Sequence, residues 1–331
     1  MSSASSSLDR ARSSSQNRIR SISEPLPRQW QSADQPPPRV TGSNIKGKYQ
    51  VTRRLGQGAS CRVYEAIRLT DNQKVAIKIL LRTTPTGMAR FQRELTIHRR
   101  LKHPNIVSLL DAGYRDHRPY LVIEYLHGKT LEEVLDARGF LKARHIVGIA
   151  EGLAAGLGAM HGTGFVHRDL KPSNIFLGRT DGGTDLTVKL IDFGLAKGIA
   201  DLTDVAQGDI TEENRCCGTP RYMAPEHILG AEAGAAADIY AVGAVMWEML
   251  TGSAPFPDPD PIKVMHCHVE HPLPDLDECL PQGNTCPTPL KQLILRCLTK
   301  NPDDRFPNGN ALLYALRDAR RRIQALQQHQ R

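Results

Sequence analysis

The residues best suited to chemistry lie close together in the stretch HRDLKPSN, at positions 167–174. An aspartate such as Asp169 can accept or orient the proton of an attacking hydroxyl, and the side-chain oxygen of Asn174 can bind a metal ion. Farther along, Asp192 opens the tripeptide Asp-Phe-Gly, in which the carboxylate can hold a magnesium ion that bridges two phosphates. These residue types in this order indicate the transfer of a phosphoryl group to a hydroxyl.

A glycine-rich stretch, LGQGASCRVYEA at positions 55–66, could hold the phosphates of a nucleotide. Gly56 and Gly58 are separated by one residue, but Cys61 stands where a third glycine would complete the pattern, and two such glycines also occur in ordinary hairpins. The tetrapeptide VAIK follows on the third predicted strand, where its Lys78 can reach the α- and β-phosphates as a point charge. Taken alone, Lys78 could equally lie on the solvent face of a strand.

Alternating apolar and polar residues predict a small sheet-based lobe, and helical periodicity predicts a larger helical lobe after it. Strands are expected at 49–55, 62–69, 74–80, 106–114 and 118–126, with a helix over 89–103. Later helices are expected at 130–139, 142–162, 236–250, 261–270, 288–300 and 309–328. Thr130 is the predicted N-cap of the first of these, with Glu133 at the capping-box position. Two such lobes imply a cleft between them, where ligand sites usually lie.

Composition and charge limit the classes of partner. The net charge of +8 and the isoelectric point near 9.2 permit a polyanion, but much of the charge lies at the two ends of the chain, so no nucleic-acid partner is expected. Seven cysteines at irregular spacing, and an opening sequence without an apolar segment, favour a reducing, cytoplasmic setting. No apolar run approaches the roughly 20 residues needed to cross a bilayer, so no transmembrane segment is expected.

The same composition divides the chain into three parts. Residues 1–45 are rich in Ser, Arg, Gln and Pro and are expected to form a disordered tail. Residues 46–320 are expected to form one folded domain, with lobes at 46–126 and 127–320. Residues 321–331 are expected to form a basic helix end.

The ordered motifs, together with Ala-Pro-Glu at 224–226, resemble those of the protein kinase superfamily over about residues 48–320. Lys171 in the catalytic stretch and Thr219 in GTPRYMAPE are the forms seen in the serine/threonine branch, and AADIYAVGAVMWEMLTGSAPF and HVEHPLP resemble the bacterial eukaryotic-type members. The resemblance implies an α+β, two-lobed protein kinase fold. Its N-lobe would be a small five-stranded antiparallel sheet with one helix, and its C-lobe would be larger and mainly helical.

The resemblance also implies roles for single residues. Lys78, Asp169 and Lys171 would be catalytic, with Asp169 as the base, and Asn174 and Asp192 would bind the metal. The residues implied to bind the nucleotide are Leu55, Gly56, Gln57, Gly58, Ala59, Ser60, Cys61, Arg62, Val63, Ala76, Lys78, Glu94, Ile123, Glu124 and Leu126.

Among these nucleotide residues, Glu94 would pair with Lys78, Val63 would cover the adenine, and Ile123 would lie at the back of its pocket. The backbone of the hinge, which includes Glu124 and Leu126, would hydrogen-bond the adenine. A thiol at Cys61 could lie close enough to bound phosphates for its oxidation or alkylation to block ATP.

A further set of residues is implied to regulate or support the site. Arg168 would receive a phosphate from the activation loop, placed first at Thr211 and otherwise at Thr203, and the acidic residues after Thr211 could supply part of that charge. The residues implied to position the substrate or brace the fold are Thr219, Glu226, Asp238 and Arg305, with an ion pair between Glu226 and Arg305.

The resemblance implies ATP and Mg²⁺ as cofactors, with Mn²⁺ as a substitute, and protein substrates that carry Ser or Thr. It is compatible with a transient dimer for autophosphorylation. Three other functions stay open: a pseudokinase that serves as an interaction module, a small-molecule phosphotransferase and a polyanion-binding protein. The segment that ends in GTPRYMAPE argues against the second of these, because it presents a protein acceptor.

His98 departs from the family pattern. Related kinases usually place an apolar residue four positions after the glutamate that corresponds to Glu94, where it packs behind the phenylalanine that corresponds to Phe193. Because a histidine titrates near neutrality, this packing could be sensitive to pH. The alternative is a polar residue that is simply tolerated at the edge of the helix.

Overall fold

The computed structural model describes residues 44–45, 47–58, 61–81, 83–179, 186–193, 197–198 and 220–329. The chain divides into two compact units, Met1–Arg39 and Val40–Arg331, and all of the described residues belong to the second. The expected tail at residues 1–45 therefore lies outside the described residues except for its last two positions.

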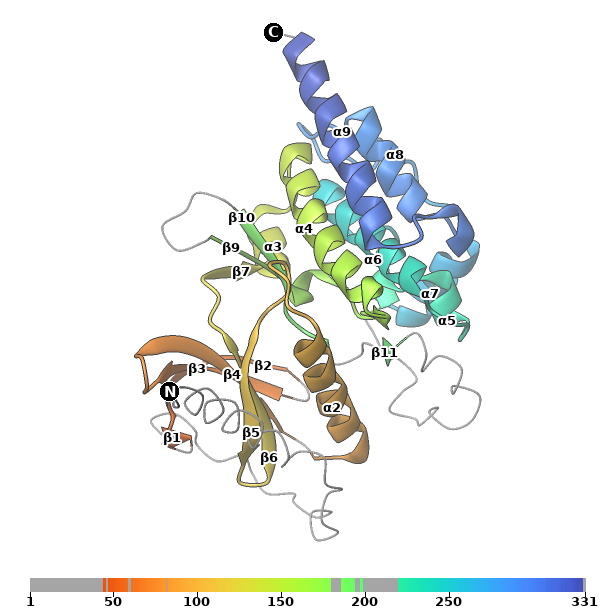
Figure 1. Ribbon diagram of the computed structural model, residues 1–331. Coiled ribbons are helices and arrows are strands. Elements are labelled where there is room, and N and C mark those ends of the chain that lie inside the picture. Colours follow the sequence, from red (N-terminus) through yellow and green to blue (C-terminus); the bar gives the residue numbers. More distant parts are fainter. Residues whose placement is uncertain are drawn as a thin grey trace, which may run out of the picture. The chain divides into compact units, whose positions relative to one another are not determined.

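A curled antiparallel sheet forms the N-terminal part of this unit (Figure 1). Its strand order is β1-β2-β3-β4-β6-β5, and each neighbouring pair is antiparallel. The strands are β1 (Asn44–Ile45), β2 (Tyr49–Gln57), β3 (Cys61–Arg68), β4 (Gln73–Leu80), β5 (Leu109–Arg115) and β6 (Arg118–Glu124). The five expected strands are therefore present as β2 to β6.

The short strand β1 corrects the expected sheet and its boundary. Asn44 and Ile45 pair with β2, and the side chain of Ile45 is fully buried. The sheet thus has six strands rather than five, and it begins before residue 46. The sequence did not signal this strand because one buried residue beside a polar tail makes no alternating pattern.

The two faces of the sheet are packed differently. One face has a core of its own, built from β-branched and aromatic residues such as Val75, Ile77 and Tyr120. The other face contacts helix α2 (Pro85–Arg100), where Leu121 of β6 packs against Phe91 and Leu95. Because side chains alternate along a strand, the residues between those of the first core are directed to the side of α2.

Helix α2 begins at a capped turn. The hydroxyl of Thr84 accepts a hydrogen bond from the Gly87 N–H at 3.1 Å, and Pro85 occupies the first helical position. Its buried residues recur at helical spacing and include Glu94 and His98 in addition to apolar side chains. The helix therefore carries two ionisable groups inward, which only specific partners can compensate.

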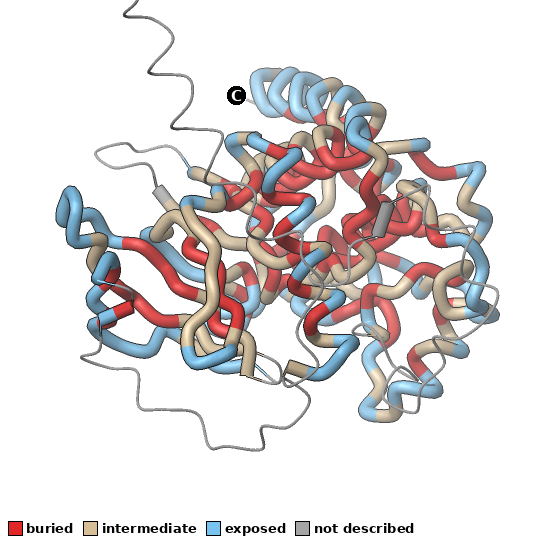
Figure 2. The backbone as a smooth tube through the Cα atoms, turned by 60° about the horizontal axis from the view of Figure 1, so that its bottom comes forward, coloured by how far each residue is buried: buried red, intermediate tan, exposed pale blue. Residues whose placement is uncertain are grey.

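The C-terminal part is mainly helical and shares one large apolar core. Its helices are α3 (Leu131–Arg138), α4 (Ala143–Gly162), α5 (Pro225–Ile228), α6 (Ala235–Thr251), α7 (Pro261–Glu270), α8 (Thr288–Cys297) and α9 (Gly309–His329). Helix α6 is buried along almost its whole length and contacts α4 and α8, while α4 also packs against α9. In Figure 2 the buried residues gather inside this helical part, and the last turns before the C-terminus are exposed.

Short strands lie between the helices of this part. A three-stranded sheet has the order β10-β9-β7, and a two-residue pair joins β11 to β8. The strands are β7 (Gly128–Thr130), β8 (Phe165–Val166), β9 (Ile175–Arg179), β10 (Leu186–Leu190) and β11 (Lys197–Gly198). These strands frame the stretch HRDLKPSN, which the sequence placed in a loop-rich region.

The expected helices are present with shifts of a few residues at their ends. The predicted capping box is confirmed, because Thr130 and Glu133 exchange hydrogen bonds between side chain and backbone at 2.7 and 3.2 Å. The largest difference is in α2, which spans Pro85–Arg100 rather than residues 89–103, and α8 ends at Cys297 rather than at residue 300. No helix among the described residues is long and apolar enough to span a membrane.

Candidate active site

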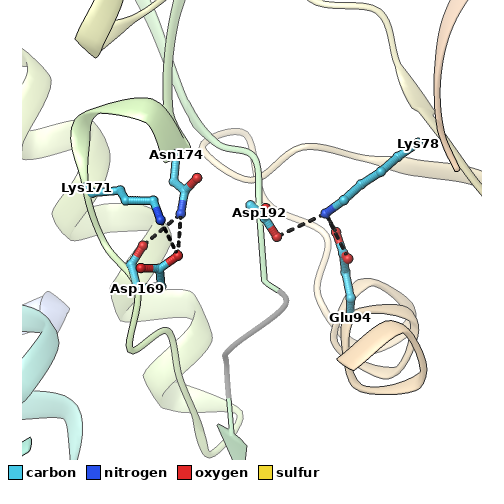
Figure 3. A network of polar contacts seen from close by, with 6 residues as sticks. All are labelled: Lys78, Glu94, Asp169, Lys171, Asn174 and Asp192. Atoms are coloured by element: carbon cyan, nitrogen blue, oxygen red, sulfur yellow. Dashed lines mark hydrogen bonds and ion pairs between the residues drawn. The ribbon is translucent and has the colours of Figure 1, made fainter. Parts of the chain in front are cut away.

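Lys78 of β4 lies at the centre of a three-residue charge cluster (Figure 3). Its ammonium nitrogen is 2.8 and 3.0 Å from the two carboxylate oxygens of Glu94, on α2, and 3.0 Å from Oδ1 of Asp192. Only 15% of the Lys78 side chain and 6% of the Glu94 side chain are exposed, whereas 39% of Asp192 is exposed. The cluster therefore joins the sheet, the helix and the segment after β10 through one ammonium group.

The charges in this cluster depend on one another. Burial alone would lower the pKa of Lys78, but Asp192 and Glu94 outweigh it and raise that pKa, so the ammonium stays charged. Burial and the nearby Asp192 carboxylate raise the pKa of Glu94 to about 6, although Lys78 opposes the shift. The carboxylates of Glu94 and Asp192 thus share the ammonium group of Lys78 at a site with little access to water.

A second group of polar side chains surrounds Asp169. Its Oδ2 accepts hydrogen bonds from Lys171 Nζ at 2.8 Å and from Asn174 Nδ2 at 3.2 Å. Asn174 Nδ2 also donates to the Asp169 carbonyl at 2.8 Å. Because the amide nitrogen of Asn174 faces Asp169, its amide oxygen is directed away from that residue, as Figure 3 shows.

Asp238, in the first turn of α6, holds the backbone that carries Asp169. Its two carboxylate oxygens accept hydrogen bonds from the backbone N–H groups of His167 and Arg168, both at 2.8 Å. Arg168 has a left-handed backbone with φ of 65°, which is strained for a residue with a side chain. The carboxylate therefore stabilises a turn that this sequence would not adopt by itself.

His161, the last buried residue of α4, completes this support. Its Nδ1 accepts a hydrogen bond from the Gly309 N–H at 3.1 Å, so its Nε2 carries the proton that it donates to Asp238 at 2.9 Å. Burial alone would raise the pKa of Asp238, but His161 and the backbone donors keep that pKa below its usual value. Sequence reasoning missed His161, because a histidine at the end of a helix carries no specific signal.

The strand register brings expected nucleotide residues to one face of the sheet. Val63 of β3 lies directly opposite Lys78, and Ala76 of β4 lies directly opposite Ile123 of β6. Residues that face each other across strands point to the same side, and so do residues two apart along one strand. Val63, Ala76, Lys78 and Ile123 therefore share the face that also packs on α2.

The glycine-rich turn between β2 and β3 leaves space beside its glycines. A side chain added at Gly56 would meet no atom of the described residues within 4 Å, and one added at Gly58 would come no closer than 4.0 Å to Cys61. Among the described residues, the turn is closed by a hydrogen bond from the Gly58 N–H to the Cys61 carbonyl at 2.9 Å. Arg62 and Gln57 also face each other there, at 2.9 Å. The open space fits the close approach of a ligand.

At the expected hinge, one backbone group is already hydrogen-bonded within the protein. The N–H of Glu124 donates to the Ser108 carbonyl at 3.0 Å, so that group is already used within the protein. The carboxylate of Glu124 accepts from Ser108 N at 2.7 Å and from Lys189 Nζ at 2.8 Å. Leu126 follows β6 and packs, half-buried, on the core of the helical part.

A pocket opens next to Asp169. It is lined by Arg168, Asp169 and Leu170 of the catalytic stretch and by residues that follow the undescribed segment, including Tyr222, Met223 and His227. Asp238 also lines it. Sequence reasoning did not name Tyr222, Met223 or His227 as site residues, although the first two lie in GTPRYMAPE, because only the fold places them beside Asp169.

Glu226 and Arg305 form a bidentate ion pair, with nitrogen–oxygen distances of 2.7 and 2.9 Å. The Arg305 side chain is fully buried and also donates to the carbonyls of Thr299, Ala236 and Lys300. Every arm of the guanidinium is thus occupied, which makes the pair a link between α5, α6 and the segment before α9.

Several expected residues lie outside the described part of the chain. These are Ala59, Ser60, Thr203, Thr211 and Thr219. Leu55, a further expected nucleotide residue, is partly exposed on β2. The other expected residues belong to the two clusters, the Asp238 support, the shared sheet face, the glycine-rich turn, the hinge and the Glu226–Arg305 pair given above.

The donor set between the two clusters fits a divalent cation. The Asn174 amide oxygen and the Asp192 carboxylate are hard oxygen donors, the type that Mg²⁺ and Mn²⁺ prefer. Asp192 is the more exposed member of its cluster, so one of its oxygens can face a ligand while Oδ1 stays beside Lys78. Among the described residues, no group of three His, Cys, Asp or Glu side chains is arranged to hold a metal by itself.

Known proteins are similar in sequence to most of this chain. Serine/threonine-protein kinase pkn3 of Myxococcus xanthus is 35% identical over 289 residues, which are 85% of this chain and 52% of that protein. PrkC of Bacillus subtilis is 33% identical over 270 residues (81% of this chain, 40% of that protein), and PknB of Mycobacterium tuberculosis is 32% identical over 275 residues (81% and 42%). Both are named serine/threonine-protein kinases.

This chain spans about half the length of those curated relatives or less. The protein kinase domain family matches residues 49–314, which contain both charge clusters, the sheet face and the Glu226–Arg305 pair. The chain therefore belongs to the protein kinase family, whose members use ATP together with a divalent metal ion.

Proposed function

We propose that this protein is an ATP-dependent serine/threonine kinase that transfers the γ-phosphate of ATP to Ser or Thr hydroxyls of protein substrates. The observation that carries the proposal is the position of Lys78, whose ammonium lies within 3.0 Å of both Glu94 and Asp192. That arrangement holds a cation beside a candidate metal ligand, where the phosphates of a nucleotide need both. The relatives named as serine/threonine kinases support the same activity.

Each polar residue near the phosphates has a role in this proposal. Lys78 binds the α- and β-phosphates, and Glu94 orients it. Asp169 orients the acceptor hydroxyl and takes its proton, and Lys171, 2.8 Å from Asp169, stabilises charge on the transferring group. Asn174 and Asp192 hold Mg²⁺, which supplies positive charge against the phosphate oxygens.

The nucleotide lies against the sheet in the same proposal. Gly56 and Gly58 let the backbone approach the phosphates, because their open sides would otherwise carry side chains. Val63 and Ala76 contact the adenine, and Ile123 closes the back of its pocket. At the hinge, the Glu124 carbonyl and the Leu126 backbone are the groups that bind adenine, since the Glu124 N–H already bonds Ser108.

Regulation is proposed through phosphorylation of Thr211, with Thr203 as the second candidate. The support is the state of Arg168, whose Nε is buried and has no hydrogen-bond partner among the described residues. Burial lowers the pKa of Arg168, and the nearby Arg93 of α2 lowers it further, although Asp238 and Glu232 oppose them. An anionic phosphate would neutralise both arginines and supply the missing acceptor.

Phosphopeptide mapping and a Thr211→Ala variant test this regulation. Mapping of active enzyme should find phosphate on Thr211, and the variant should keep its fold but lose most of its activity. Full activity in Thr211→Ala would contradict the proposal and leave Thr203, or the acidic residues after Thr211, as the source of charge.

The chain's organisation is also proposed. Residues 46–320 form the kinase domain that Asn44 and Ile45 extend, residues before them form a tail, and residues 321–331 form a basic helix end. Among the described residues, Cys267, Cys279, Cys286 and Cys297 form no disulfide, which supports a reducing compartment such as the cytoplasm. A transient dimer would let one copy phosphorylate the activation segment of another.

Radiolabelled ATP and a generic protein acceptor test the activity. Wild-type protein with Mg²⁺ should label casein on serine and threonine, and Asp169→Asn should lower that labelling by about a thousandfold without unfolding the protein. Equal, near-zero labelling by both proteins would favour the second candidate, a pseudokinase that serves as an interaction module.

A further inference from the structure

His98 of α2 lies in the interior beside the charge cluster, and no role in the proposed reaction accounts for it. Only 4% of its surface is exposed. It follows Glu94 by one helical turn, so it projects from the same side of α2. The neighbour of its ring is Phe193, the residue directly after Asp192. Phe193 is fully buried.

Phe193 is held between two imidazole rings. The ring of His98 meets it edge-on, with centroids 5.1 Å apart and an interplanar angle of 89°. The ring of His167, from the catalytic stretch, also makes an edge-type contact with it, with centroids 5.5 Å apart and an interplanar angle of 61°. This row of three rings joins α2, the Asp192 segment and the catalytic stretch, so it connects the elements that carry the two charge clusters.

The His98 ring is a polar group in an apolar place. Among the described residues, neither of its nitrogens has a hydrogen-bond partner of ordinary geometry, and both atoms are buried. An apolar side chain of similar size would fill this space without leaving a donor and an acceptor unpaired. His98 therefore places an energetic penalty at the contact between α2 and Phe193 that an apolar residue would not.

Ionisable groups face the His98 ring from the elements that pack around it. Lys78 of β4 disfavours a second positive charge, Asp192 favours one, Glu94 lies one turn before it on α2, and His167 faces it across Phe193. Burial, followed by Lys78, lowers the pKa of His98 to about 4, although Asp192 and the backbone of Val107 oppose the shift. Burial likewise lowers the pKa of His167. The packed row thus holds both imidazoles in their neutral forms.

We propose that His98 is a positioning residue that makes the assembled site conditional on pH: a neutral ring lets Phe193 pack and keeps Glu94 beside Lys78, and a proton on the ring loosens that packing. The inference rests on the proposed kinase function for its activity readout, but not for its stability readout.

The direction of the effect follows from the two states of the ring. In the packed state the pKa of His98 is about 4, and in a loosened, solvated state it returns to the ordinary value near 6.5. Packing is therefore fully favoured above pH 6.5 and is lost progressively as the pH falls toward 4. Between pH 7.5 and 5.5, the ratio of packed to loosened protein should fall by up to about tenfold.

Two substitutions of His98 distinguish the effect of the ring's charge from the effect of its polarity. His98→Leu removes both the proton and the unpaired polar atoms, and His98→Gln keeps a polar group that cannot titrate. His268→Gln is the matched control, because burial also lowers the pKa of His268 to about 4, but its ring bonds the Tyr240 hydroxyl at 2.7 Å and the Arg221 carbonyl at 3.1 Å. Glu94, with a pKa near 6, titrates in all of these proteins and cancels in the comparison.

The measurement is kcat/KM for ATP with casein at pH 7.5 and 5.5, together with the midpoint of thermal unfolding at both values. The ratio of activities (pH 7.5 over 5.5) of the wild type should exceed that of both His98 variants by up to about tenfold. The ratio of activities of His268→Gln should equal that of the wild type. His98→Leu should also unfold at a higher temperature than the wild type, with the larger gain at pH 5.5.

Equal pH ratios in the wild type and both His98 variants, with parallel unfolding midpoints, would overturn the inference while leaving the kinase function in place. A wild-type protein that transfers no phosphate would overturn the proposed function instead. In that case the difference in unfolding midpoints between wild type and His98→Leu still decides the role of His98.

Discussion

The two charge clusters of the site are supported in different ways. Asp169 follows two residues whose backbone N–H groups donate hydrogen bonds to Asp238. Asp238 is 1% exposed and lies on a helix in the large core. Lys78 is held by Glu94 and Asp192 through side chains from separate elements. The first support is a pair of short, buried hydrogen bonds to the backbone, whereas the second depends on how α2 and the Asp192 segment lie against the sheet.

The difference indicates which half of the site can vary. Breaking the Asp238 support exposes a strained turn and leaves buried donors unpaired, so that support and the fold are lost together. Breaking the Lys78 support costs less, because its long side chain can keep one partner while it loses another. Asp169 is therefore held as part of the rigid core, and Lys78 is placed by an adjustable contact.

Asp238→Asn should have the largest effect and should damage both activity and stability. An amide cannot accept from His167, Arg168 and His161 together, and its own N–H₂ would oppose one of those donors. We expect the free energy of unfolding to fall by about 3 kcal/mol and turnover to fall by about a hundredfold. Urea denaturation and the labelling assay measure the two effects. Normal stability with lost activity would show that Asp238 does not brace the fold.

Glu94→Gln should damage activity far more than stability. Loss of the charged hydrogen bonds to Lys78 should lower kcat/KM for ATP by roughly thirtyfold, which corresponds to about 2 kcal/mol. The free energy of unfolding should change by less than about 1 kcal/mol, because Lys78 keeps Asp192 and a neutral amide is easier to bury.

Matched kinetics and denaturation of this variant and of Asp238→Asn check the contrast between the two supports. A stability loss in Glu94→Gln as large as that of Asp238→Asn would remove the distinction, since both clusters would then be parts of one rigid unit.

Thr130→Ala should have the smallest effect and sets the baseline for a change outside both clusters. The substitution removes the capping box of α3 and should lower the free energy of unfolding by about 1 kcal/mol. Its kcat/KM should equal that of the wild type, because α3 carries neither cluster. A large activity loss would mean that α3 contacts the nucleotide or the acceptor.

Much of the fold could be predicted from local pattern. Strands β2 to β6 alternate clearly, and the helices have apolar faces and caps such as Thr130, so short-range chemistry specifies them. The two-residue β1 could not be found, because its one buried residue gains its place only by pairing with β2. The end of α8 was also misjudged, since periodicity alone does not show where a helix stops.

The site divides in the same manner. Asp169, Asn174, Lys78 and Asp192 stand in motifs whose residue types and order are informative before any fold is known. His161 stands in no motif. It bonds two residues distant in the chain, Asp238 and the backbone of Gly309.

The sequence by itself determined the candidate residues for phosphoryl transfer, the order of the elements and the family resemblance, because each depends on neighbouring positions. Tertiary structure decided which of these residues meet. It placed Lys78 between Glu94 and Asp192, tied the strained Arg168 turn to Asp238, and set Phe193 between His98 and His167. The physical reason is that burial and charge pairing arise between segments far apart in the chain, and no local pattern records the distance that folding closes.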